Sequence, residues 1–182
     1  MVELSAYDKI TRAKVQLYNT KPFFSHLTMN MKCIETDEVP SMGVDMRGHL
    51  YYNPKWVDKL SEKECEGVLV HEVLHIVLQH LLRCGGREGE LFNCSNDLIV
   101  NDILVTENMA LPEGLVPTYE HKFVMPEFNY TIENINDKSS EQLYDELYKL
   151  LKKKGKGGGS GKSGKGKGDG TGGLSKKRFE EH

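Results

Sequence analysis

The feature that most constrains this chain is the stretch from Val68 to Leu78, which reads H-E-x-x-H within an otherwise apolar run. Eight of its eleven residues are aliphatic, and the three polar ones are His71, Glu72 and His75. At about 100° per residue, those three side chains fall on one arc of a helix, while the rest of the circumference is apolar. The pattern therefore predicts a helix that is buried in the protein.

Two imidazoles and a carboxylate in a buried helix are costly unless another group satisfies them. A zinc ion does so directly, because histidines at i and i+4 present two nitrogens to one metal and the glutamate between them reaches a metal-bound water. The spacing thus predicts a Zn²⁺ site with His71 and His75 as ligands and Glu72 as the catalytic residue. A tetrahedral site needs a third protein ligand and leaves the fourth position for water.

Two residues are candidates for the third ligand. His80 lies five residues beyond His75, so in a continuous helix it points about 180° away from His71. Asp97 begins a second predicted helix, which can pack antiparallel to the first. We therefore expect Asp97 as the third ligand, with His80 as the alternative. Asn101, one turn after Asp97, can accept a hydrogen bond from the back nitrogen of a ligating histidine and fix its tautomer.

Capping and periodicity predict the helices. Ser61 and Glu64 form an S-x-x-E capping box, so the motif helix should begin at Glu62, run to Arg83 and stop at Gly85-Gly86. Apolar periodicity and start signals predict further helices. These lie at residues 3–19, 54–60 and 94–108, and from Ser139 or Ser140 to Leu151.

Alternation predicts the strands. A half-buried strand is expected at Leu27–Ile34, and two short strands at Ser41–Met46 and His49–Tyr52 flank a tight turn. Residues 109–138 are rich in proline and are expected to be irregular, with at most a short extended piece at Phe123–Met125. The result is an α+β fold, a small and mainly antiparallel sheet packed on the motif helix. His49–Tyr52 is the expected sheet edge for an extended peptide.

Charge divides the chain into two parts. Residues 152–182 hold ten Lys or Arg and three acidic residues, a net charge of +7, whereas residues 1–151 hold 14 basic and 24 acidic residues, a net charge of −10. We therefore expect a folded domain over 1–151 and a flexible Gly/Lys-rich tail over 152–182. The tail lacks interleaved aromatic residues, which favours a solvated linker over a nucleic-acid contact.

The N-terminus has no apolar signal segment, and no apolar run is long enough to span a membrane. The four cysteines match no zinc-knuckle spacing and are expected to be reduced. These features predict a cytoplasmic protein that does not bind a membrane.

With these motifs the chain resembles the metallopeptidase domain of predicted metal-dependent peptidases from bacteria and phages. Asn96-Asp97 followed by Asn101 is similar to the N-E-x-x-x-D stretch of gluzincins, with Asp in place of Glu, which supports Asp97 as a ligand. The resemblance implies a compact zincin with a second helix that carries an acidic ligand. It extends over several further segments: Lys21–Phe24, Leu50–Pro54, His71–His75 with His80 and Arg83, Asn93–Asp97, Leu111–Gly114 and Glu141–Leu147.

In many of these relatives a von Willebrand A-like domain follows, and cooperation with AAA-type ATPases is suggested. This chain stops after the Gly/Lys-rich segment, so we expect either a stand-alone form or a fragment.

Two functions fit the sequence. The first is a zinc-dependent peptidase that hydrolyses a peptide or protein substrate, with Glu72 as the general base. Such an enzyme also needs a group that stabilises the oxyanion, for which Tyr119, His121 and Tyr130 are candidates. The alternative is a zinc-stabilised module that binds a protein partner without cleaving it.

Overall fold

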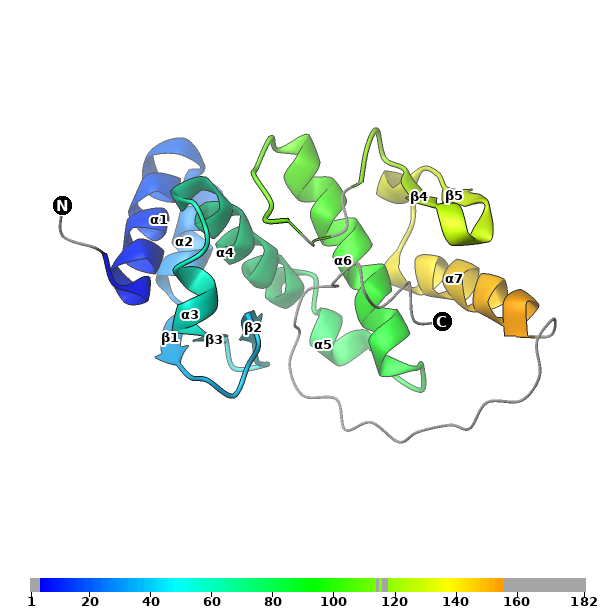
Figure 1. Cartoon of the computed structure of the whole chain (residues 1–182), viewed down its shortest axis with the longest axis horizontal. Helices are drawn as coiled ribbons and strands as arrows, with labels where there is room; N and C mark the ends of the chain where they lie inside the picture. Colours follow the sequence, from blue (N-terminus) through cyan, green and yellow to red (C-terminus); the bar gives the residue numbers. More distant parts are fainter. Residues whose placement is uncertain (1–3, 114, 116–117, 156–182) are drawn as a thin grey trace.

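The chain folds into an α+β structure in which two small sheets lie beside the helices (Figure 1). The computed structural model describes residues 4–113, 115 and 118–155. Within them the α-helices are Ala6–Thr20 (α1), Pro22–Met29 (α2), Pro54–Val57 (α3), Glu62–Val77 (α4), His80–Arg83 (α5), Gly89–Thr106 (α6) and Ser140–Gly155 (α7). The strands are Lys32–Glu35 (β1), Met42–Val44 (β2), His49–Tyr52 (β3), Phe123–Met125 (β4) and Tyr130–Ile132 (β5), and the 3-10 helices are Pro126–Phe128 (η1) and Ile135–Asp137 (η2).

The N-terminal helix α1 agrees with the prediction for residues 3–19. It begins at a capping box in which Ser5 and Asp8 each bond the other's backbone amide. It ends at Thr20, and Pro22 then opens α2 at a position where the missing N–H costs no hydrogen bond.

The predicted strand at Leu27–Ile34 is wrong over most of its length, because the chain stays helical to Met29 and only Lys32–Glu35 pairs in a sheet. Phe24 and Thr28 lie one helical turn apart and are both buried on one face of α2. This helical period outweighs the apolar alternation seen in the same residues.

The three-stranded sheet has the order β1-β3-β2. The two short predicted strands are confirmed, and Gly48 supplies the positive φ of +79° in the turn between them. Strand β3 pairs antiparallel with β2 and parallel with β1, so this sheet is mixed. Because β3 lies in the centre, the expectation that His49–Tyr52 forms a sheet edge is wrong; the edges are β1 and β2.

Helix α4 begins as predicted, with Ser61 and Glu64 forming a capping box. Every residue from Cys65 to His75 is buried, as the apolar run requires. At Gly67 the backbone of Ala110 comes close to the backbone of α4, because a Cβ added there would lie 1.9 Å from the carbonyl oxygen of Ala110. The segment after α6 therefore crosses directly over α4 at a position that only glycine can occupy.

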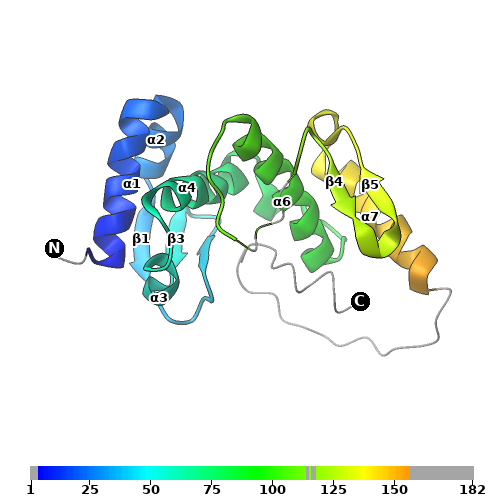
Figure 2. The same cartoon turned by 45° about the horizontal axis from the view of Figure 1, so that its top comes forward.

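The second half of the chain contains more structure than the sequence predicted. Helix α6 begins five residues earlier than expected, at Gly89, where the side chain of Glu88 accepts from the amides of Glu90 and Leu91. Within residues 109–138 the short extended piece expected at Phe123–Met125 is confirmed as β4, and it pairs antiparallel with β5 to form a hairpin that was not predicted. The final helix, α7, is confirmed and packs against α6 (Figure 2).

Helix α7 runs to Gly155 and so includes the first residues of the predicted tail. The remainder of that predicted tail lies outside the described residues. All four cysteines are free. None of the helices in the described part of the chain has the length and apolar character needed to cross a membrane.

Candidate metal centre

Helices α4 and α6 bring three ligand-type side chains to one point. His71 and His75 stand one turn apart on α4, and their Nε2 atoms lie 3.0 Å from each other. The Oδ1 atom of Asp97 on α6 lies 3.5 Å from His71 Nε2 and 3.1 Å from His75 Nε2. The three side chains are 3%, 0% and 1% exposed, so the cluster lies inside the protein.

These distances match those of a metal site. Metal–ligand bonds of about 2.0–2.2 Å in a tetrahedral site place the ligand atoms about 3.3 Å from one another. Two imidazole nitrogens that face each other without a cation can share only one proton, whereas a cation between them satisfies both lone pairs and the carboxylate. The donor set of two imidazoles and one carboxylate therefore fits a divalent metal ion.

The electrostatics of the three groups are strongly coupled. Burial alone would raise the pKa of Asp97, but hydrogen bonds from His71 and His75 prevail and hold it well below its usual range. Burial lowers the pKa of His75. His71 is also disfavoured as a cation by burial, yet Asp97 and Glu72 raise its pKa overall. Asp97 is therefore ionised and available as an anionic ligand.

Glu72 lies beside this cluster on α4 and is 2% exposed. Its Oε2 atom has no hydrogen-bond partner among the described residues. Burial raises the pKa of Glu72 to about 8, with His71 lowering it and Asp97 raising it further. A buried carboxyl group with an unpartnered oxygen and a raised pKa is a candidate general acid–base residue.

Behind His71 the contact predicted for Asn101 is present. Asn101 Oδ1 lies 3.0 Å from His71 Nδ1. An amide oxygen only accepts, so Nδ1 carries the proton and Nε2 is left with a free lone pair. That is the tautomer that a metal ligand at Nε2 requires.

The predicted continuous helix from Glu62 to Arg83 is wrong. Helix α4 ends at Val77, and Gln79 adopts the left-handed conformation with φ 56° before α5 begins at His80. His80 therefore does not point to the opposite side but is buried against His75, with the two Nδ1 atoms 3.2 Å apart.

His80 does not join the three converging ligand atoms, because it faces the far nitrogen of His75. Burial lowers the pKa of His80 to about 3, so its imidazole is neutral. Its other neighbour is Ser140 on α7, a contact that the sequence did not reveal because it joins residues 60 positions apart. The assignment of Asp97 as the third ligand stays a prediction, now with a geometry that fits it.

The three candidates for oxyanion stabilisation differ in their surroundings. Tyr119 is 73% exposed. The hydroxyl of Tyr130 donates to Glu146 Oε1 at 2.8 Å. His121 Nδ1 lies 2.7 Å from Asp102 Oδ2, which orients its ring. The role of all three stays a prediction.

A family model described as "Putative metallopeptidase domain" matches residues 5–180 of the chain. An uncharacterized protein of Thermotoga maritima is 21% identical over 132 residues, which cover 65% of this chain and 33% of that protein. The chain therefore spans 33% of the length of this relative. No solved structure matches the chain.

Proposed function

We propose, from the premise that the chain belongs to the family described as "Putative metallopeptidase domain", that it is a zinc-dependent peptidase. His71, His75 and Asp97 would hold the metal, and Glu72 would act as the general base. The observation that carries the proposal is the buried, unpartnered Oε2 of Glu72 beside three converging ligand atoms.

A zinc ion in this cluster would lower the pKa of a bound water and polarise the scissile carbonyl group. Glu72 accepts the proton of the attacking water at its carboxylate and passes it to the leaving amine. Asn101 keeps the proton of His71 on Nδ1, which leaves Nε2 available. The apolar neighbours on α4 exclude bulk water, which strengthens each of these interactions.

The decisive experiment combines metal analysis with a peptidase assay. Purified wild-type protein should contain one zinc per chain and cleave a mixture of fluorogenic peptides. Glu72→Gln should keep the zinc and reduce cleavage by about 10²–10⁴-fold, because it removes only the proton acceptor. Glu62→Gln is a matched control on the same helix, since Glu62 lies in its exposed first turn, and it should change neither readout.

Three outcomes contradict the proposal. If the purified protein holds no metal, the three residues do not form a metal centre. If Glu72→Gln cleaves at the wild-type rate, Glu72 is not the general base. Zinc binding without any cleavage would instead favour the alternative, a zinc-stabilised module that recruits a protein partner.

A further inference from the structure

Each ligating imidazole has a second nitrogen that must also be satisfied. For His71 that nitrogen faces the amide oxygen of Asn101. For His75 it faces another imidazole, because His80 Nδ1 lies 3.2 Å from His75 Nδ1. The two rings meet edge to face, with their centroids 5.0 Å apart and their planes at 79°.

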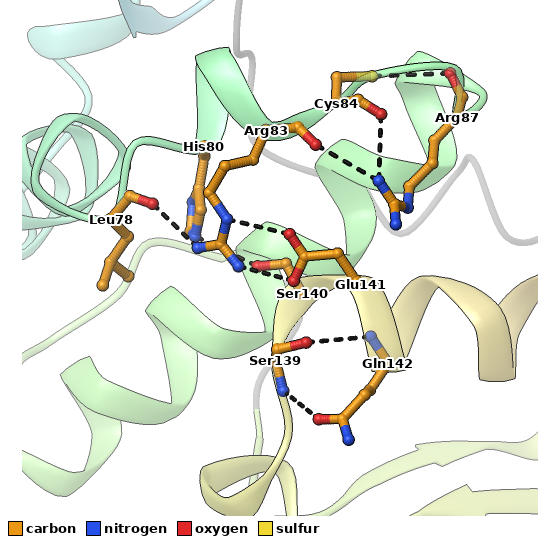
Figure 3. Close-up of polar contacts among 9 residues, drawn as sticks. All are labelled: Leu78, His80, Arg83, Cys84, Arg87, Ser139, Ser140, Glu141 and Gln142. Carbon is orange, nitrogen blue, oxygen red and sulfur yellow. Dashed lines mark hydrogen bonds and ion pairs between the residues drawn. The ribbon is translucent and has the colours of Figure 1, made fainter.

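The positions of the protons follow from the ligand geometry. His75 directs Nε2 at Asp97 and His71, so a metal would bind there and the proton must sit on Nδ1. That proton points at His80 Nδ1, which must then be an acceptor. A neutral His80 that accepts at Nδ1 carries its own proton on Nε2, and this atom lies 3.3 Å from Ser140 Oγ (Figure 3).

The chain turns sharply so that His80 can reach this position. Gln79 takes the left-handed conformation, which is disfavoured for a residue with a Cβ atom and requires compensation elsewhere. Arg83 provides it: Nη1 donates to the carbonyl oxygen of Leu78, which the helix break leaves without an intrahelical partner, at 3.0 Å. The same guanidinium bonds both carboxylate oxygens of Glu141 at 3.0 and 2.7 Å (Figure 3).

We propose that His80 is the positioning residue of His75, accepting its Nδ1 proton and donating its own Nε2 proton to Ser140. The inference rests on the proposed metal centre but not on peptide cleavage. It makes the first turn of α7 part of the centre, although no residue of α7 is a ligand. The hydrogen bonds run from His75 Nδ1 to His80 Nδ1 and from His80 Nε2 to Ser140 Oγ. The ion pair between Arg83 and Glu141 joins α5 to α7 beside them.

Substitutions of His80 distinguish a hydrogen-bonding role from a simple packing role, because some keep the acceptor and others keep only the volume of the ring. His80→Phe keeps an aromatic ring but has no acceptor, so His75 Nδ1–H is left buried and unpaired. His80→Asn is smaller but places Oδ1 close to where Nδ1 stood and can still accept. Leu82→Ala is the matched control on α5, because that side chain is 67% exposed.

The test is zinc affinity, measured by competition with a chromophoric chelator, for these three variants beside the wild type. His80→Phe should bind zinc about 10–100-fold more weakly, the usual cost of losing the partner of a ligating histidine. His80→Asn should recover most of the affinity, and Leu82→Ala should match the wild type. A packing role predicts the reverse order, with Asn weaker than Phe. Wild-type affinity in His80→Phe, or that reverse order, would overturn the proposal.

A second readout does not depend on any substitution. Long-range ¹H–¹⁵N correlation spectra of the zinc-loaded wild type report which imidazole nitrogen carries the proton. We expect His75 protonated at Nδ1 and His80 at Nε2 alone. A proton on His80 Nδ1 would overturn the proposal. Neither readout involves hydrolysis, so protein that binds zinc and cleaves nothing leaves this inference standing while the proposed peptidase activity fails.

Discussion

The described residues form two apolar cores, which differ in what they contribute to the proposed metal centre. The first contains α1, α2, the three-stranded sheet and α4, and it supplies His71, Glu72 and His75. The second contains the hairpin of β4 and β5 and helix α7, which pack on the N-terminal half of α6. This second core supplies no member of the H-E-x-x-H motif, yet Ser140, which contacts His80, belongs to its helix α7.

Helix α6 belongs to both cores. Leu91 and Leu98 pack in the second core, whereas Val100 and Leu104 pack in the first. Asp97 lies where the helix passes from one core to the other, and Figure 1 shows α6 running between the two parts of the molecule. The motif therefore belongs to the first core alone, whereas the proposed metal centre requires that the two cores are held together.

Removing the carboxylate of Asp97, which lies between the two cores, should have a large effect on metal binding. Asp97→Ala should weaken zinc binding by about 100-fold or more, since each ligand carries roughly a quarter of the binding energy of a structural zinc site. The measurement is zinc content after dialysis, with His80→Ala analysed in parallel. Full zinc retention in Asp97→Ala, with loss in His80→Ala, would reverse the choice of third ligand.

Removing the metal should weaken the contact between the two cores and so lower the stability of the protein. At zinc concentrations of 100 to 1,000 times the dissociation constant, binding stabilises the folded state by about 3–4 kcal/mol. A chelator should therefore lower the thermal unfolding midpoint of the wild type. In His71→Ala the chelator should have no effect, and an equal drop in that variant would show that the chelator acts somewhere other than this centre.

A third prediction concerns the first core alone. Gly67→Ala places a methyl group against the Ala110 carbonyl oxygen and should destabilise the protein by about 3 kcal/mol, the upper range for overpacking. Gly86→Ala is the matched control, since an added Cβ there meets nothing within 4 Å. Urea unfolding measures both. Equal stabilities would mean that the segment after α6 does not lie on α4 as described.

The smallest effect is expected for the ion pair between Arg83 and Glu141. Its hydrogen bond from Arg83 lowers the pKa of Glu141 to about 2 from 4.5. Because the folded-state value is the lower one, the stabilisation is present above pH 4.5 and is lost as the pH falls towards 2. Both side chains are about a third exposed, so we expect only about 1 kcal/mol.

The free energy of unfolding of Glu141→Gln and wild type, measured with chelator present, should differ by this amount at pH 7 and converge in acid. In an Arg83→Met background most of the difference should disappear, and what is left reflects the hydrogen bonds that Ser139 and the backbone amide of Glu141 make with this carboxylate. An undiminished difference in that background would show that Arg83 is not the main partner of Glu141.

Much of the site was predictable from sequence, for a local reason. The capping box at Ser61 and the 3.6-residue period placed His71, Glu72 and His75 on one face of a buried helix. The same periodicity placed Asp97 and Asn101 on one face of the second helix. Backbone hydrogen bonds and side-chain spacing within one helix depend only on residues that are close in the chain. Which side chains share a helix face can therefore be predicted without knowledge of the fold.

The extended piece expected at Phe123–Met125 is β4, but its pairing with β5 was not predicted, because both strands are three residues long and carry no strong alternation. Met125 and Ile132 are buried against Leu143 and Leu147 of α7, so the hairpin depends on packing rather than on its own pattern. The order β1-β3-β2 was likewise not readable, because strand pairing joins segments that only the folded chain brings together.

Local sequence patterns are thus enough to indicate the candidate metal ligands and the helices that carry them. Where α4 ends and which side chains surround His80 depend instead on the packing of the whole fold. No glycine or proline near Gln79 indicates its left-handed conformation in the sequence. In the folded chain this turn occurs together with two contacts to α7, from His80 to Ser140 and from Arg83 to Glu141. A disfavoured backbone conformation persists only when distant contacts compensate for it, and such contacts exist only once the two cores have packed.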